Sequence, residues 1–536
     1  MRAAAAAALL LAGCGPAVLG IDVELITKAC PGATSGTDPL AGVTRLRFGL
    51  TGDGLGQQTV TVDLAKGAAQ LPNIPVGRNR RITVDALIGA SVRARADSGK
   101  FDAPGPADVH LRLFLRNLDA FTGTGDAAAA CTHLTAPRAG HAMALLPDGR
   151  VLISGGFSFD QSSPPNLIYR DDVEVFDPGT GSFAPLTPAP LLRRAGHASL
   201  SVSGESGAGI LLAGGEGPPD AAGVTKATAV KPFELFANGS WTELLPAGPA
   251  RTHAASAVDL RTGSALIAGG QSGPDVPGVS VYSTLTYFDP ATNAVKDAAS
   301  PLRAGPLTDA VAVARGNLSG HTALGGVVLV GGRDQNGRVL AQISGLVWGP
   351  SPAGGLDFVD DATFKAPGFV LPTPRAHHIA LRTVDDLVLT AGGVTALTVG
   401  AFDYSNATAA ITLIDPTASA AGQAFDLPSP LSQARADACA VLLDDGTALV
   451  AGGAWKDAGG AHSARSVDLI AADRSVRKAF GPPNGAGDGS LQAARHRAAC
   501  LKLRDGSVLI SGGLQYPAGG GTPVVLDSAE IYMPAQ

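Results

Sequence analysis

A diglycine that recurs seven times, each time directly after a short apolar segment, is the feature that most constrains the fold. Consecutive copies begin between 55 and 62 residues apart. A regular period of this kind is typical of repeat proteins, in which each copy supplies one supersecondary unit. We expect the glycines to be structural, because they permit close backbone packing and positive φ angles. They are Gly155 and Gly156, Gly214 and Gly215, Gly269 and Gly270, Gly331 and Gly332, Gly392 and Gly393, Gly452 and Gly453, and Gly512 and Gly513.

Each copy carries the same order of signals. An arginine opens it, and a strand of small apolar residues such as 141–146 follows. A tight turn comes next, as at Asp148-Gly149, because Asp-Gly between apolar segments favours a hairpin. The diglycine strand, a polar loop, a third strand such as 173–178 and a fourth such as 182–186 complete the copy. Four short antiparallel strands per copy predict one blade of a β-propeller.

This pattern resembles the kelch repeat, whose copies share an Arg-x-x-His start, the diglycine, a strand ending in Asp-Pro and a strand with an aromatic residue. The resemblance covers residues 126–536 and implies an all-β, seven-bladed kelch-type β-propeller. It departs from the family in the fourth strands, where Trp241 is the one clear tryptophan, and in the long first hairpin of the fourth copy. The opening arginines are Arg138, Arg194, Arg251, Arg303, Arg375, Arg435 and Arg495.

The last copy stops at its third strand, 528–532. We therefore expect an N-terminal strand, 128–135, to complete the seventh blade and close the ring, which removes a free edge.

The region 14–125 lacks the repeat and alternates apolar and polar residues, as in 46–50, 60–64 and 109–115. Several such strands predict a small β-sandwich that precedes the propeller. It could be a spacer between the propeller and a membrane, or a carbohydrate-binding module.

The first 13 residues have one basic residue and a short apolar segment, as in a secretory signal peptide. Residues 11–14, Leu-Ala-Gly-Cys, resemble the lipobox of bacterial lipoproteins. That resemblance implies cleavage before Cys14 and acylation of Cys14, and several acyl chains would anchor the protein stably. We expect a lipid-anchored protein of the bacterial cell envelope, and Gly15 favours the outer membrane. An ordinary signal peptide is the alternative.

The charge balance argues against nucleic acid as a partner. Lys and Arg total 40 and Asp and Glu total 46, for a net charge of −6, whereas nucleic-acid binding needs a basic surface. After residue 12 no apolar stretch approaches the length of a membrane-spanning helix.

Four cysteines remain after Cys14, and an even number in an exported chain could form disulfides. Strand parity allows Cys439 and Cys500 to face each other between the sixth and seventh blades, and Cys30 and Cys131 could tie the sandwich to the propeller. Buried free thiols are the alternative. None of these cysteines has zinc-ligand spacing, so we expect no metal.

Antiparallel order places the loops between second and third strands at one edge of each blade, together with the opening Arg and His. Long loops on a rigid scaffold are where function usually lies. A ring of arginines could bind an anion, and loop aromatics could bind sugars or protein partners. The alternative is that these residues clamp neighbouring blades or pack within loops. The candidate binding residues are Arg138, His141, Arg194, His197, Arg251, His253, Arg375, His377, His378, Arg435, Arg495, Tyr169, Tyr404, Trp455 and Tyr516.

The function that these features favour is a non-catalytic binding scaffold for a glycan or a protein, with no cofactor. The alternative is a carbohydrate-active enzyme, because galactose oxidase resembles the chain in having a sandwich before a kelch propeller. That family's copper ligands include a Tyr-His pair and a histidine from a further C-terminal domain. No Tyr-His dipeptide occurs here, and the chain ends within the seventh repeat. Scattered loop carboxylates such as Asp160 and Asp172 could still serve a hydrolase or an epimerase, and a purely structural envelope protein is a third hypothesis.

Overall fold

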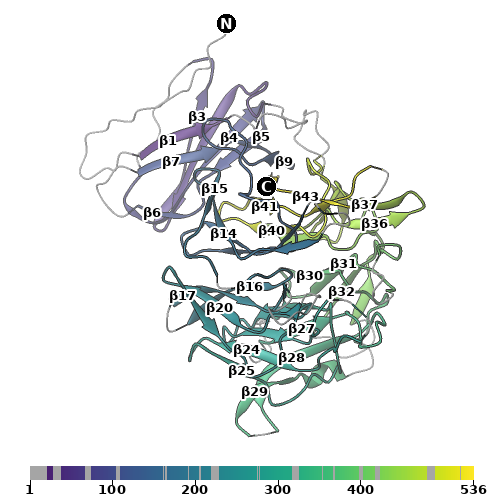
Figure 1. Cartoon of the computed structure of the whole chain (residues 1–536). Coiled ribbons are helices and arrows are strands. Elements are labelled where there is room, and N and C mark those ends of the chain that lie inside the picture. Colours follow the sequence, from purple (N-terminus) through teal and green to yellow (C-terminus); the bar gives the residue numbers. More distant parts are fainter. Residues whose placement is uncertain are drawn as a thin grey trace.

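The structure is a computed structural model (Figure 1), and it describes residues 21–27, 30, 38–66, 74–103, 109–160, 162, 166–190, 192–204, 207–218, 228–274, 276, 278–316, 325–352, 354–365, 369–397, 403–416, 423–479, 489–518 and 521–535. The segment 1–13 and Cys14, on which the expected signal peptide and lipid anchor fall, lie outside these ranges. Within them the chain is all-β, apart from one turn of 3-10 helix, η1 (Ala362–Lys365). None of the described segments forms a helix long and apolar enough to span a lipid bilayer.

The N-terminal part forms two small sheets. The larger has the order β3-β2-β4-β5-β8, with β6 on β4, and the smaller pairs β1 with β7 in parallel. Leu46, Leu50, Val84 and Leu113 are buried in one core between these strands, as the alternating pattern predicts. The strands are β1 (Ile21–Ile26), β2 (Arg45–Gly52), β3 (Leu55–Asp63), β4 (Gly77–Ile88), β5 (Ser91–Asp97), β6 (Phe101–Ala103), β7 (Val109–Phe114) and β8 (Arg116–Asn117).

Over the described residues from β9 onwards, seven four-stranded antiparallel sheets form the main body of the chain. Their second strands carry the apolar segment before each diglycine, and these strands are buried, as expected for the interior of a sheet stack. The strands, in order of pairing, are β10 (Ala142–Leu145), β11 (Val151–Ser154), β14 (Val173–Asp177) and β15 (Ser182–Pro185) in the first sheet; β16 (Ala198–Gly204), β17 (Gly207–Ala213), β20 (Phe233–Ala237) and β21 (Ser240–Leu244) in the second; β22 (Ala255–Val258), β23 (Ala265–Ala268), β24 (Leu285–Asp289) and β25 (Ala294–Asp297) in the third; β26 (Val311–Ala314), β27 (Val327–Val330), β28 (Ile343–Pro350) and β29 (Leu356–Asp360) in the fourth; β30 (Ile379–Arg382), β31 (Val388–Ala391), β32 (Ile411–Ile414) and β33 (Ala424–Asp426) in the fifth; β34 (Cys439–Leu442), β35 (Ala448–Ala451), β38 (Val467–Ile470) and β39 (Val476–Lys478) in the sixth; and β40 (Ala499–Lys502), β41 (Val508–Ser511), β44 (Ala529–Met533) and β9 (Ala120–Gly123) in the seventh.

Successive sheets are joined in a cyclic order. The first strand of each sheet contacts the first strand of the next, and β40 of the seventh sheet contacts β10 of the first. The second glycine of each diglycine donates its N–H to a carbonyl of the following sheet, and the last such bond runs from Gly513 to Arg138. A side chain at Gly155 would lie 2.4 Å from the Arg194 carbonyl oxygen, so the diglycines are required for this approach. The arrangement is consistent with a β-propeller.

The seventh sheet takes its fourth strand from β9, and not from 128–135 as the sequence led us to expect. β9 pairs with β44 in antiparallel register, and Phe121 buries its ring against Tyr532 with the centroids 5.0 Å apart. The segment 128–135 makes only isolated bridges, such as His133 to Ser528. Phe121 supplies an aromatic surface that the alanine-rich segment lacks, and burying that surface favours β9.

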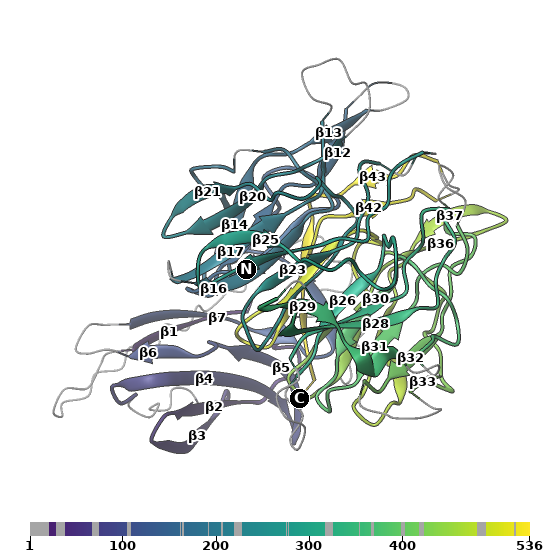
Figure 2. The same cartoon turned by 90° about the horizontal axis from the view of Figure 1, so that it is seen from below.

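Four loops between second and third strands carry small hairpins. Figure 2 shows the β12–β13 hairpin on the side of the seven sheets away from β2, β3 and β4. The end of each sheet at which its second strand passes into this loop is called the loop face below. The hairpins are β12 (Phe157–Phe159) with β13 (Leu167–Tyr169), β18 (Glu216–Gly217) with β19 (Thr228–Ala229), β36 (Ala454–Asp457) with β37 (Gly460–Ser463), and β42 (Leu514–Gln515) with β43 (Val524–Val525).

Candidate functional site

The arginines proposed as an anion-binding ring lie in the interior, which corrects the expectation that they line an open mouth. Each donates from Nη1 to the carbonyl of the first glycine of its own sheet's diglycine, at 2.8–3.5 Å. Arg303 does not belong to this set, because Leu307 occupies the equivalent position in the fourth sheet. The side chains that are at most 1% exposed are Arg138, Arg194, Arg251, Arg375, Arg435 and Arg495.

Buried polar partners hold these guanidinium groups. Arg194 lies 2.6 Å from Glu234, and Arg495 lies 2.6 Å from Glu530. Such a group buried among protein partners cannot present its charge to a solvent-borne anion. Each of these arginines therefore holds the diglycine turn of its own sheet in place, as a clamp would.

Three of the candidate histidines also lie between sheets. His141 lies 2.9 Å from the Ser511 hydroxyl, and His197 lies 2.9 Å from that of Ser154, in each case in the preceding sheet. Burial lowers the pKa of His141 to about 3 and holds the pKa values of His197 and His378 well below the ordinary range. These rings are thus neutral spacers within the interior at physiological pH.

A different recurring position does line the loop face. It lies two residues after the opening Arg, or after Leu307 in the fourth sheet, and its backbone is left-handed in all seven sheets, with φ between 51° and 61°. The residue before it bridges to the residue after the diglycine, which places it at the loop face. Left-handed φ angles are uncommon for residues other than glycine, and their clustering points to a functional site. In cyclic order the position holds Gly140, Gly196, His253, Asp309, His377, Asp437 and Arg497.

Backbone hydrogen bonds link neighbouring members of this set. Gly196 donates its N–H to the Gly140 carbonyl at 2.7 Å, Asp309 donates to His253 at 3.0 Å, and Gly140 donates to Arg497 at 3.1 Å. The last of these joins the seventh sheet to the first. The side chains at these positions are therefore held close to one another at one end of the cyclic stack.

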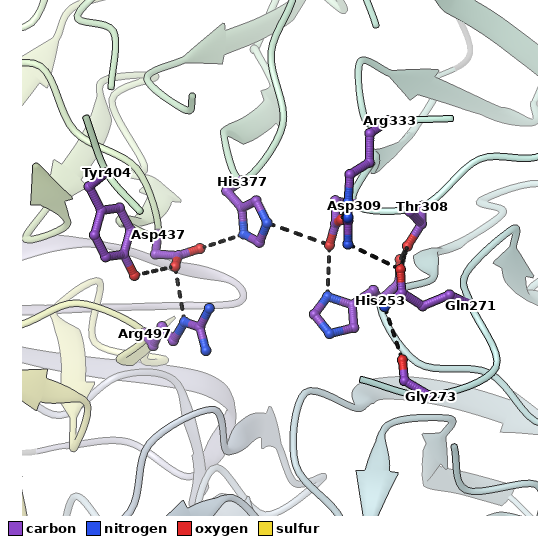
Figure 3. Close-up of polar contacts among 10 residues, drawn as sticks. All are labelled: His253, Gln271, Gly273, Thr308, Asp309, Arg333, His377, Tyr404, Asp437 and Arg497. Carbon is purple, nitrogen blue, oxygen red and sulfur yellow. Dashed lines mark hydrogen bonds and ion pairs between the residues drawn. The ribbon is translucent and has the colours of Figure 1, made fainter. Parts of the chain in front are cut away.

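The five side chains form a continuous polar chain, shown in Figure 3. His253 Nδ1 lies 2.7 Å from Asp309, and His377 bridges Asp309 and Asp437 at 3.7 and 3.0 Å. Arg497 Nε donates to Asp437 at 3.0 Å. We call this series, from His253 to Arg497, the polar chain.

Residues outside the left-handed position hold the polar chain in place. Tyr404 donates its hydroxyl proton to Asp437 at 2.8 Å, and Arg333 pairs with Asp309. Arg333 also donates to the Gln271 amide oxygen at 3.1 Å, and Thr308 donates to the same oxygen at 3.2 Å. Because these partners are nearly buried, the carboxylates of Asp309 and Asp437 are fixed in orientation.

The electrostatics favour the charged forms of Asp309, Asp437 and His253. Burial would raise the pKa values of Asp309 and Asp437, but neighbouring histidines and arginines outweigh burial and hold both pKa values well below the ordinary range. Burial likewise opposes the charge on His253, yet the Asp309 carboxylate outweighs it and raises the pKa of His253. Burial together with Asp437 raises the pKa of Tyr404. Both carboxylates are thus ionised at neutral pH.

The two glycines leave a gap in this circle of side chains. Gly140 and Gly196 are neighbours, and a Cβ atom at Gly196 would have no atom within 4 Å. The two members that flank the gap are the most open, since the side chain of Arg497 is 34% exposed and that of His253 is 26% exposed. The accessible part of the site therefore lies beside Gly196.

The candidate aromatic residues divide into two groups. Tyr169 and Tyr404 are buried, and Tyr169 donates its hydroxyl to Glu216 at 3.2 Å. Tyr516 and Trp455 are half-buried and stack on histidines, Tyr516 on His496 and Trp455 on His462, with ring centroids 5.0 Å apart in both pairs. Tyr404 bonds to the polar chain and Tyr516 packs edge-on against Tyr404, whereas Tyr169 and Trp455 lie on the hairpins.

The sequence analysis named His253, His377 and Tyr404 but missed Asp309, Asp437, Arg497 and Arg333. A signal was present in the sequence, because Asp437 and Arg497 fall two residues after the arginines that open their repeats. In the fourth repeat the signal is displaced, because Asp309 follows Leu307 and not Arg303. Aligning the seven repeats at that position would have shown polar residues replacing glycine.

The cysteines form the two pairs that strand parity and domain order allowed. Cys30 pairs with Cys131, and Cys439 pairs with Cys500, with Cα atoms 4.7 and 5.9 Å apart. Over the described ranges, no group of three or more His, Cys, Asp or Glu side chains has the spacing of a metal site.

Comparison with known proteins gives distant likenesses of fold among solved structures. No protein-family model matches the chain, and no curated protein matches it. A solved structure titled "Structure of YjhT" aligns with 65% of this chain and 98% of its own, at 16% sequence identity and a TM-score of 0.41.

Proposed function

We propose that the chain is a seven-bladed kelch-type β-propeller preceded by a small β-sandwich, and that it binds a glycan or a protein without catalysing a reaction. The observation that carries this proposal is the gap beside Gly196. There a fixed, charged circle of side chains opens between its two most exposed members, His253 and Arg497. A preorganised polar site loses little entropy when a ligand binds.

The surroundings of the gap suit a polar ligand. Arg497 and His253 are donors, and the pKa of His253 is raised, which favours its protonated form. Glu216, on the β18–β19 hairpin, contributes a negative charge that acts on both residues. Hydroxyl-rich glycans and polar protein loops both offer matched acceptors and donors for such a mixed site.

Thermal unfolding with a ligand panel tests this proposal. The panel holds neutral glycans, acidic glycans and peptides of the envelope proteins that co-purify after cross-linking. A ligand at 100 times its Kd should add about 2.7 kcal/mol of stability, which is a visible shift in the unfolding temperature. A shift with any member supports a binding scaffold. Unfolding temperatures that stay constant across the whole panel would contradict it.

We further propose that acyl chains on Cys14 anchor the protein in the bacterial envelope, in the outer membrane. The support is the lipobox-like segment 11–14 with Gly15 after it. Labelled fatty acid should be incorporated into the wild type and lost in Cys14→Ala, which should also leave the membrane fraction. Incorporation that persists in Cys14→Ala would contradict the anchor.

A further inference from the structure

A cavity lies on the opposite side of the seven sheets from the polar chain. It has a volume of about 600 Å³, is partly open to solvent, and lies between the N-terminal sheets and the turns of the first and seventh sheets. Phe101, Phe114 and Arg116 line it from the N-terminal side, and Gly149 and Arg504 line it from the two hairpin turns. We call it the interdomain cleft.

Close contacts on two sides keep the walls of the interdomain cleft together. A Cβ atom at Gly99 would lie 3.3 Å from the backbone of Arg504, and one at Gly181 would lie 3.1 Å from the ring of Phe114. The Cys30–Cys131 disulfide and the β9–β44 pairing also join the two parts of the chain. The cleft is therefore a fixed feature and not a gap between loosely tethered units.

The carboxylates that line the interdomain cleft all have donors of their own. The partners are side chains or backbone N–H groups at 2.6–3.0 Å. A carboxylate that already accepts such bonds has little need of a bound cation. The pairs are Asp97 with Arg81, Asp102 with the Asn79 N–H, Asp148 with Arg150, Asp177 with the Gly179 N–H, and Asp505 with the Ser507 N–H.

Arg116 is a half-buried cation among the residues that line the cleft. Its guanidinium carbon lies 5.1 Å from the centre of the Phe114 ring. It makes no hydrogen bond or ion pair with any residue in the described part of the chain, and Asp505 acts on it only at longer range. Burial lowers the pKa of Arg116, so its charge is partly desolvated, and only the more distant Asp505 offsets this cost.

We propose that the interdomain cleft binds a sugar acid, whose carboxylate is held by the guanidinium of Arg116. The planar fork of arginine matches a carboxylate in bidentate geometry. The rings of Phe101 and Phe114 offer an apolar wall for the face of a sugar ring. The cleft has the volume of a small-ligand site. This site is separate from the gap beside Gly196, so either proposal can fail without the other.

Calorimetric titration of the full-length chain in detergent with glucuronate tests this inference. Glucose serves as the neutral match, and inorganic phosphate serves as the oxyanion without a sugar. The wild type should bind glucuronate more tightly than glucose or phosphate. Arg116→Gln should weaken glucuronate binding about tenfold or more, because it removes a charge-assisted pair of hydrogen bonds.

Two variants control for folding and for local charge. Arg150→Gln removes a cation that lines the same cleft but already pairs with Asp148, and it should bind glucuronate as the wild type does. Arg116→Lys keeps the charge without the fork and should bind more weakly than wild type. Equal affinity in wild type and Arg116→Gln would overturn the role of Arg116. Phosphate binding as tight as glucuronate binding would overturn the sugar acid, and no binding of glucuronate would overturn the site.

Discussion

At the scale of single residues, burial decides what each charge does. Arg194 and Glu234 form an ion pair in which the side chains are 1% and 0% exposed. Arg193 and Asp171, close by in the same region, form an ion pair in which both side chains are about half exposed. The same type of ion pair, arginine with a carboxylate, therefore occurs once in the low-dielectric interior and once at the solvated surface.

This contrast gives a prediction for stability. Glu234→Ala leaves the Arg194 charge buried without its partner and should lower the free energy of unfolding by about 3–5 kcal/mol. Asp171→Ala removes only a solvent-screened contact and should cost less than about 1 kcal/mol. Urea unfolding of the two variants measures both values. Equal losses would show that the Arg194 clamp is not a buried ion pair.

The buried histidines predict how stability depends on pH. The pKa of His141 is about 3 in the folded chain, against an ordinary value of about 6.5 in the unfolded chain. Between these values the unfolded state binds the proton and the folded state does not. Stability is therefore highest above pH 6.5 and falls as the pH decreases.

For His141 alone, the loss between pH 7 and pH 5 should be about 2 kcal/mol. His141→Gln should show a correspondingly smaller decrease in unfolding free energy over the same interval, measured by urea unfolding at both pH values. His253, whose pKa is raised, contributes in the opposite direction between pH 7 and pH 6, because the folded state holds its proton to higher pH than the unfolded state does. This contribution is the same in the wild type and in His141→Gln, so it cancels in the comparison. An unchanged decrease in His141→Gln would rule out His141 as a source of the pH dependence.

Sequence analysis identified the recurrent arginines but could not tell a clamp from a binding ring, because both use arginine once per repeat. The deciding information was the polar residue at the second position of the third strand, where Glu174, Glu234 and Glu530 lie buried. A carboxylate inside an apolar strand signals a buried partner.

At the scale of elements, the diglycines set how closely neighbouring sheets approach. Gly269 has φ of 65°, and a Cβ atom there would lie 2.1 Å from the Leu307 carbonyl oxygen. Gly239, in the turn between β20 and β21, has φ of 77° but would meet no atom within 4 Å. A side chain at Gly269 would therefore meet both a steric clash and an unfavourable φ angle, whereas one at Gly239 would meet only the unfavourable φ angle.

Gly269→Ala should therefore destabilise the protein by more than about 3 kcal/mol, since it adds a backbone clash to an unfavourable φ. Gly239→Ala should cost about 1 kcal/mol from the φ angle alone. Thermal unfolding of both variants gives the comparison. A Gly269→Ala variant as stable as Gly239→Ala would mean that the sheets can move apart at little cost.

The Cys439–Cys500 bond joins the first strands of the sixth and seventh sheets, 61 residues apart in sequence. Chain-entropy arguments give a loop of this length a stabilisation of about 4 kcal/mol. The double variant Cys439→Ala/Cys500→Ala should lose most of this in denaturant unfolding under oxidising conditions. Under reducing conditions it should match the wild type. A wild type that is insensitive to reductant and matches the variant would contradict the bond.

At the scale of the whole molecule, the N-terminal part and the seven sheets share an element. β9 lies before the repeats in the chain and completes the last sheet. Asp119, just before β9, accepts a hydrogen bond from Tyr532 and pairs with Arg477 at 2.8 Å. This sharing places the boundary between the two parts inside the region 14–125 that sequence analysis gave to the N-terminal domain.

The repeats, their strand order and the region before them were readable because spacing and alternation are local properties of the sequence. The closing strand was not, because 120–123 and 128–135 are both short and neither carries a turn signal that fixes its register. The polar chain depends on contacts between residues of successive repeats, such as His253 and Asp309. The interdomain cleft depends on contacts between residues hundreds of positions apart, such as Gly99 and Arg504. Such contacts are set by the packing of whole sheets and not by local pattern.

The proposed ligand enters the gap beside Gly196, and a variant that fills this gap tests the proposal most directly. Gly196→His introduces a residue that the same left-handed position already holds at His253 and His377, so the backbone should tolerate it. Gly239→His adds the same side chain at the distant turn between β20 and β21. With a ligand that raises the unfolding temperature of the wild type, we predict the same rise in Gly239→His and none in Gly196→His. An equal rise in both variants would contradict the account.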